Sequence, residues 1–136
     1  MKYDGFIGEV QHRAQLDSRE AALGTSRVTL TTLSERIDPG LAENLGAKLP
    51  EKLGRFREEV DDVERFAFDE FVDRVVERED IGEVEPADAA FHAQVVVDVV
   101  DEAVTEGALQ DVEDQPPDGE GYENLFEIAD AEGSPT

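Results

Sequence analysis

The sequence contains no cysteine. Disulfide bonds, cysteine-based metal sites and thiol nucleophiles are therefore excluded. Long hydrophobic runs are also missing, because uninterrupted apolar stretches such as the valines at 95–97 stop at three residues. A membrane-spanning helix needs roughly 20 apolar residues. The first residues lack the charged and apolar regions of a signal peptide. We expect a cytoplasmic protein with no membrane partner.

Positive charge is scarce. The 136 residues include 12 Lys and Arg against 35 Asp and Glu, which gives a net charge of −23. Because phosphate binding requires a basic surface, we expect no nucleic acid partner. A hydrophobic fraction of 39% with clear periodicity argues against a disordered chain. Dense surface carboxylates suit strong salt, where the Debye length falls to about 3 Å at 1 M. We therefore expect the cytoplasm of a halophile.

The negative charge is unevenly distributed. Residues 1–60 carry nine basic and ten acidic side chains, a net charge of −1, whereas residues 61–136 carry three and 25, a net charge of −22. One interpretation is drift between two related halves, with an acidic tail added. The other is that one half offers a surface to a partner while the other keeps the assembly soluble.

A short pattern explains why the chain has related halves. Residues 3–13 read YDGFIGEVQHR and residues 68–78 read FDEFVDRVVER, with apolar residues at relative positions 1, 4, 5 and 8 in both. This spacing is one face of a helix. Self-similarity at a fixed separation indicates that one supersecondary unit was duplicated.

The two copies are expected to fold together. A single repeat on its own would be only marginally stable, because small chains bury too little of their surface. We predict one domain at 1–130, with repeat one at about 3–66 and repeat two at about 68–128. The small polar residues 131–136 are expected to form a disordered tail.

Helix start signals divide each repeat into four helices. Asp17 and Glu20 form a capping-box pattern that opens a long second helix. Asp38 is placed to cap the third helix, with Pro39 in its first turn, and Pro86 suits the first position of a later helix. The expected helices are about 4–14 (capped by Asp4), 18–37, 39–49 and 50–66, then 68–79, 86–104, 106–113 and 122–128.

These motifs resemble a known family. The paired (Tyr/Phe)-Asp-x-Phe-(Ile/Val) openings, the joints at Gly40 and Gly107, and the segments Leu49-Pro50 and Pro116-Pro117 are similar to Domain of Unknown Function 2267, over about residues 3–128. The second proline segment departs from the usual Leu-Pro. The resemblance implies an all-α protein built from two repeats, which we expect to pack about a pseudo-two-fold axis. It implies no catalytic or binding residues, because the family's function is uncharacterised.

Few residues suggest chemistry. His12 lies near Glu9 and His92 lies one helical turn after Asp88, but a metal site needs three or four ligands. Both histidines are therefore expected at the surface or its boundary. A phosphate-binding loop and a nucleophile elbow are absent from the sequence. We predict no enzyme activity, no cofactor and no metal.

Arg13 and Arg78 occupy the same place in both copies, at the end of the amphipathic helix. The simpler interpretation is a cation that balances the carbonyls and dipole at a helix C-terminus. The alternative is an anion-binding site that the two arginines form across the pseudo-two-fold axis.

The helix expected at 86–104 is apolar on two sides. Beside a broad face of alanine and valine it carries a second stripe, Phe91, Val95 and Val99. This stripe is either buried in the monomer, a surface for self-association or a protein partner, or part of a groove for a small apolar ligand. We predict a non-enzymatic protein-interaction or assembly module. The alternative is a small-molecule-binding module with an apolar cleft between the repeats.

Overall fold

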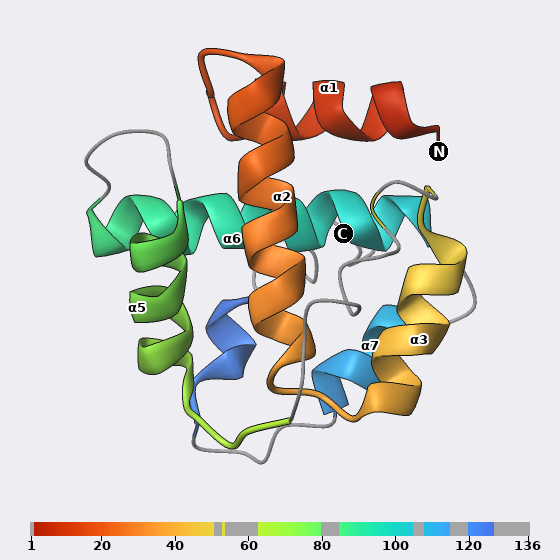
Figure 1. Cartoon of the computed structure of the whole chain (residues 1–136), viewed down its shortest axis with the longest axis vertical. Coiled ribbons are helices and arrows are strands. Elements are labelled where there is room, and N and C mark those ends of the chain that lie inside the picture. Colours follow the sequence, from red (N-terminus) through yellow and green to blue (C-terminus); the bar gives the residue numbers. More distant parts are fainter. Residues whose placement is uncertain are drawn as a thin grey trace, which may run out of the picture.

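Helices make up all the regular secondary structure in the residues that the computed structural model describes, namely 2–50, 53, 63–79, 85–104, 108–114 and 120–126. The prediction of an all-α fold is confirmed for these residues. The elements are α1 (Tyr3–Arg13), α2 (Arg19–Ser34), α3 (Pro39–Lys48), α5 (Phe68–Arg78), α6 (Pro86–Ala103), α7 (Ala108–Asp114) and the short 3-10 helix η2 (Tyr122–Asn124) (Figure 1).

Two of the predicted helix starts need correction. The side chain of Ser18, and not that of Asp17, caps α2 by accepting a hydrogen bond of 3.1 Å from the amide of Ala21. Helix α1 begins at Tyr3 without a side-chain cap, so Asp4 lies inside its first turn. The prediction for α3 is confirmed, because the Asp38 carboxylate accepts from the amide of Gly40 at 2.8 Å. These caps satisfy amides that have no partner within their own helix.

The helix predicted at 50–66 lies mostly outside the described residues, and its predicted end is wrong. Residues 63–67 are not helical. The amide of Glu64 donates to the carbonyl of Glu35 at 2.7 Å, and the carbonyl of Phe66 accepts from Arg36 and Tyr122. Backbone groups that a helix would pair internally are here paired with distant segments.

The last helix of repeat two is shorter than predicted. The helix expected at 122–128 is a 3-10 turn that ends at Asn124. Helix α7, expected at 106–113, is described from Ala108 to Asp114, and its predicted start lies outside the described residues. Residues 127–128 and the tail at 131–136 lie outside the described residues.

The helices pack in a reciprocal pattern. Helix α1 packs on α2 and α6, α5 packs on α6 and α2, α2 packs on α6, and α3 packs on α7. In Figure 1, α1 and α6 run across the molecule, α2 and α5 run nearly perpendicular to them, and α3 and α7 lie together at the edge opposite α5. Exchanging α1 with α5, α2 with α6 and α3 with α7 leaves this set of contacts unchanged.

One continuous core joins these helices. Phe6 of α1 and Phe71 of α5, which occupy matching positions in the two sequence patterns, are both fully buried. Phe71 also packs edge-on against Tyr122, with ring centroids 6.1 Å apart. Because α6 is packed against α1, α2 and α5, most of its surface is covered.

Candidate functional site

The structure separates the three residues of the predicted stripe on α6. Val95 and Val99 are 3% and 0% exposed, whereas Phe91 is 38% exposed. The three residues therefore do not form one exposed surface, and for Val95 and Val99 burial in the monomer is the correct interpretation. The physical reason is that α6 is central and has neighbouring helices on both of its apolar sides.

Phe91 lies in an accessible part of α6. Its neighbours in the first turns, Pro86, Ala87 and Asp88, are exposed, and Ala90 is half-buried. This N-terminal end of α6, at the left in Figure 1, thus presents a small apolar surface. We call it the Phe91 corner and define it by Pro86, Ala87, Ala90 and Phe91.

Arg13 forms ion pairs that link α1 to α6. Its guanidinium lies 2.7 Å from the carboxylate of Asp98, 2.8 Å from that of Glu102 and 2.8 Å from that of Glu9 on its own helix. Burial lowers the pKa of Arg13, but the hydrogen bonds to Glu102 and Asp98 and their negative charges outweigh it and raise the pKa overall. The arginine compensates a carboxylate, that of Asp98, which is almost fully buried.

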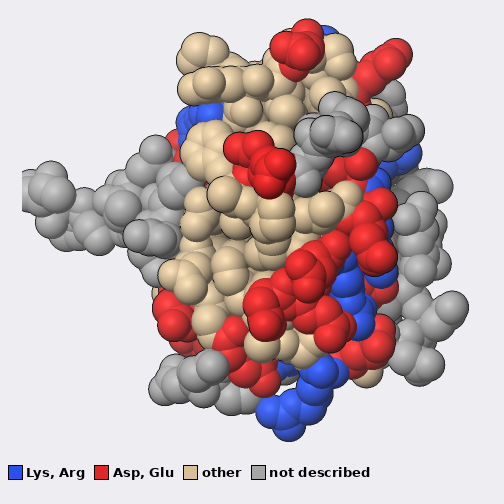
Figure 2. Space-filling view, turned by 90° about the vertical axis from the view of Figure 1, so that its left-hand side faces the viewer, with Lys and Arg blue, Asp and Glu red and all other residues tan. Residues whose placement is uncertain are grey.

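Arg78 does the same between α5 and α2. It donates to the carboxylate of Glu35 at 2.6 and 3.0 Å and to the hydroxyl of Thr32 at 3.0 Å. Arg74 joins this cluster through Glu35, Glu64 and Glu70. Figure 2, which views the side where α5 lies, shows a band of acidic side chains running beside basic ones.

The predicted anion site receives no support from this geometry. Arg13 and Arg78 lie in two different clusters, and each is already engaged by carboxylates of a neighbouring helix. Each arginine is at the end of its helix, as the sequence indicated, but its partners are carboxylates. An added anion would have to displace them.

A buried polar cluster joins α2, α5 and α6. The side chain of Glu79, which follows the last residue of α5, is 0% exposed. One of its oxygens accepts from the hydroxyl of Thr25 at 3.1 Å and lies 3.0 Å from Nδ1 of His92. His92 was expected at the surface or its boundary, and this is wrong, whereas His12 is exposed as predicted. Sequence reasoning missed Glu79, because nothing local indicates which residue a buried histidine will meet.

This cluster has the residue types of a catalytic site but not its arrangement. In a nucleophilic triad the histidine lies between the hydroxyl and the carboxylate. Here Glu79 lies between Thr25 and His92, so the hydroxyl donates to the carboxylate and is not activated by the imidazole. Within the described part of the chain, no group of three or more His, Cys, Asp or Glu side chains could hold a metal ion.

A second buried arginine was also missed. Arg36 is 2% exposed, donates to the carbonyl of Phe66 at 3.1 Å and to the carboxylate of Glu120, and lies over the ring of Tyr122. Burial raises the pKa of Tyr122 above its usual value. These contacts link the segment at 120–126 to the residues that follow α2.

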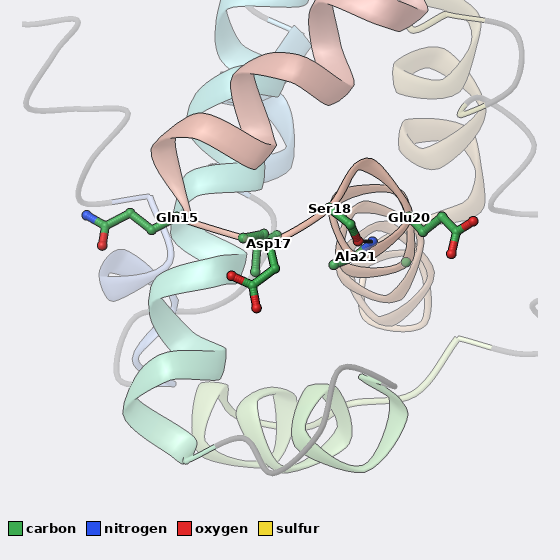
Figure 3. A pocket seen from close by; sticks show the side chains of 7 residues that line it. Gln15, Asp17, Ser18, Glu20 and Ala21 are labelled. Carbon is green, nitrogen blue, oxygen red and sulfur yellow. Dashed lines mark hydrogen bonds between the residues drawn. The ribbon is translucent and has the colours of Figure 1, made fainter.

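The structure also has a surface depression of about 490 Å³ where α1 turns into α2. Its lining residues are Gln15, Leu16, Asp17, Ser18, Glu20, Ala21 and Gly24. Figure 3 shows the side chains of Gln15, Asp17 and Glu20 pointing in three different directions. The depression lies entirely within repeat one, and its polar groups do not converge on one point.

The turn beside this depression is strained. Gln15 has a φ of 56°, in the left-handed region that favours glycine. The amide of Leu16 donates to the carbonyl of Gln11 at 3.0 Å and that of Gln15 to His12 at 3.3 Å. This is the Schellman pattern that ends a helix, so the strain belongs to the termination of α1.

The comparisons with known proteins identify a family. In the part of the chain that is described, no helix is long and apolar enough to cross a bilayer. No curated protein matches the chain. The model of one family, described as "Uncharacterized conserved protein (DUF2267)", matches residues 3–125, from the start of α1 to just after η2. The resemblance seen in the sequence is therefore confirmed, and the chain belongs to this family.

Proposed function

We propose that this protein is a non-enzymatic protein-interaction module whose contact surface is the Phe91 corner. The observation that carries the proposal is the 38% exposure of Phe91 on a helix whose middle and later valines are buried. Aromatic side chains bring a large apolar area at low entropic cost and are enriched among the residues that dominate interfaces.

The comparison with α2 supports this choice. In the repeat alignment, position 91 on α6 corresponds to position 24 on α2, where the chain has Gly24. Nothing lies within 4 Å of a Cβ built at Gly24, so this side of α2 is open as well. Only repeat two places a large aromatic side chain at this open position. An exposed aromatic ring that one repeat has and the other lacks is better explained by a contact than by packing.

A catalytic role is less well supported. The residues with the most suitable chemistry, Glu79 and His92, have side chains that are 0% and 11% exposed. A substrate could not reach the carboxylate without opening the packing of three helices. The buried groups satisfy one another, which is what buried polar groups must do in a stable fold.

The proposal includes the arrangement of the two repeats. The ion pair between Arg13 and Glu102 joins α1 to α6, and that between Arg78 and Glu35 joins α5 to α2. In the alignment, Arg13 corresponds to Arg78 and Glu35 to Glu102. This exchange, together with the reciprocal helix contacts, supports two repeats related by a pseudo-two-fold axis.

The proposal also keeps the setting inferred from composition, the salt-rich cytoplasm of a halophile. A net charge of −23 is better tolerated when salt screens the repulsion. Circular dichroism from 1 M to tens of millimolar potassium chloride tests this. Helicity should fall as salt is removed, and a constant signal over this range would contradict the proposed setting.

No observation favours the alternative of a small-molecule site between the repeats. The depression described above is lined by residues 15–24 of repeat one alone. Where α2 and α6 meet, the described positions are filled by buried side chains such as Leu30, Val96 and Val100.

Photocrosslinking tests the proposed surface directly. A benzophenone amino acid placed at position 91 should give a defined adduct in cells of the source, identified by mass spectrometry. The matched control is position 63, because Val63 is exposed to a similar extent, 40%, but lies outside α6. Absence of an adduct at 91, or the same adducts at both positions, would contradict the proposal.

A further inference from the structure

We infer that the partner of the Phe91 corner is a cationic amphipathic segment, with apolar side chains that meet Phe91 and Arg or Lys side chains beside them. This inference rests on the proposed function and specifies the chemistry of the partner. It is drawn from the charges around Phe91 and from how those charges are paired.

The first observation is the absence of basic residues from this end of the chain. Residues 79–136 contain no Lys or Arg and 18 Asp and Glu. The whole of α6 therefore carries acidic charge alone. The charged groups that α6 itself contributes beside the Phe91 corner therefore favour a partner with positive charge.

The second observation is that three exposed carboxylates, near the start of α6 and in η2, have no basic partner among the described residues. Glu85, Asp88 and Glu123 are exposed, and none makes an ion pair with another residue that the structure describes. Glu85 lies just before the first turn of α6, and Asp88 lies in that turn. Glu123 precedes Asn124, whose carbonyl accepts a hydrogen bond from Gln94, one turn beyond Phe91.

Some carboxylates elsewhere in the molecule have basic partners. Arg13 engages Glu9, Asp98 and Glu102, and Arg74 engages Glu35, Glu64 and Glu70. The Phe91 corner is an apolar surface beside carboxylates that are available to pair with the cations of a partner. Interfaces gain specificity from this kind of complementarity, because the wrong sign of charge is rejected.

A second copy of this chain is a poor occupant of the corner. Each copy has a net charge of −23, so an isologous contact would bring the acidic surface of one copy, including Glu85 and Asp88, close to that of the other. Like charges brought together in this way oppose association. A cationic segment removes the conflict.

Strong salt changes how much ion pairs and apolar burial each contribute to binding, but a cationic partner is still favoured. At 1 M salt the Debye length is about 3 Å, close to the length of a direct ion pair, so long-range attraction fades while pairs in contact persist. Apolar burial is not weakened by potassium chloride in this way. Phe91 should therefore supply most of the affinity, and the carboxylates should determine which partners are accepted.

Three synthetic helical peptides test the inference on the full-length protein by fluorescence anisotropy at 0.15 and 1 M potassium chloride. The first has a Leu stripe flanked by Arg, the second has the same stripe flanked by Glu, and the third has the Arg residues but Ser in the stripe. The first peptide should bind at both salt concentrations, and the other two should bind at least about tenfold more weakly at 1 M.

Variants of the protein separate recognition from adsorption to an acidic surface. Phe91→Ser should weaken binding of the first peptide by about tenfold or more, and Asp88→Asn should weaken it a few-fold and flatten its salt dependence. Val63→Ser, the matched control, should leave binding unchanged. Equal binding of the Arg and Glu peptides, or binding that ignores Phe91→Ser, would overturn the inference.

The inference and the proposed function can fail separately. A defined crosslink at position 91 without preference for the cationic peptide would retain the interaction surface and reject a cationic partner. Formation of a crosslinked dimer would identify a second copy as the occupant and would also reject a cationic partner. No crosslink and no peptide binding would reject both.

Discussion

Helices α2 and α6 occupy equivalent places in the fold, but the side chains that they bury differ in polarity. Both pack on α1 and α5 as well as on each other. The buried residues of α6 include Val95, Val96, Val97, Val99 and Val100, whereas those of α2 include Thr25, Ser26, Thr29, Thr32 and Ser34. One backbone arrangement thus accommodates a valine surface in one repeat and a hydroxyl surface in the other.

The difference follows from what each helix must pair. Two of these hydroxyls pair with the charged end of α5, since Thr25 donates to the buried carboxylate of Glu79 and Thr32 accepts from Arg78. The hydroxyl of Ser26 donates within α2 to the carbonyl of Ala22. Glu79 has no polar counterpart in repeat one, where the aligned residue is Ala14. The buried surface of α6 is mostly valine, with two polar exceptions: Asp98, which pairs with Arg13 of α1, and His92, which contacts Glu79.

The largest expected effect concerns the valine surface. Replacing Val95 and Val99 together with Gln should unfold the protein, because each buried amide without a partner costs about 2–7 kcal/mol against a total stability of roughly 5–15 kcal/mol. Thermal denaturation followed by circular dichroism measures this. Phe91→Gln on the same helix is the control. A double variant that melts like the parent would show that these valines are not core residues.

A smaller effect tests whether the repeats are equivalent in energy as well as in position. Phe6 and Phe71 are both fully buried, so Phe6→Ala and Phe71→Ala should each cost about 3–5 kcal/mol. Urea denaturation of the two variants provides the comparison. If either variant loses less than about 1 kcal/mol, the two copies are not equivalent anchors and the pseudo-two-fold account fails.

The smallest effect has the opposite sign. The hydroxyl of Thr29 is buried without a hydrogen-bond partner in the structure, and its aligned residue on α6 is Val96. Thr29→Val should therefore stabilise the protein by about 1 kcal/mol, because an unsatisfied buried hydroxyl is removed at nearly constant shape.

Thr32→Val is the matched control for this change. Its hydroxyl accepts from Arg78, so its loss should destabilise the protein in the same urea titration. If Thr29→Val destabilises the protein as much as Thr32→Val does, the Thr29 hydroxyl has a partner, such as a buried water, and the contrast between α2 and α6 is weaker than described.

Local patterns in the sequence were enough to predict the helices but not their neighbours. Periodicity and capping signals indicated α1, α3, α5 and α6 to within about two residues, as helix signals commonly do. They also indicated that α6 is apolar on two sides. They could not show which neighbour covers each side, so the burial of Val95 and Val99 needed the tertiary structure.

The polar clusters were unpredictable for the same reason. His92 and Glu79 are 13 residues apart, Thr25 and Glu79 are 54 apart, and Arg36 and Glu120 are 84 apart. Such pairs depend on how helices cross and leave no periodic trace. The failed helix end at 63–67 is similar, since its backbone is paired with Glu35, Arg36 and Tyr122.

The central claim is that α6 has a buried middle and a recognition surface at its beginning. Phe91→Ser tests it most directly, with the melting temperature and the binding of the Arg-flanked peptide measured on the same sample. The account predicts a stability within about 0.5 kcal/mol of the parent, as for exposed positions, together with loss of binding. A variant that melts far below the parent, or one that binds as the parent does, would contradict it.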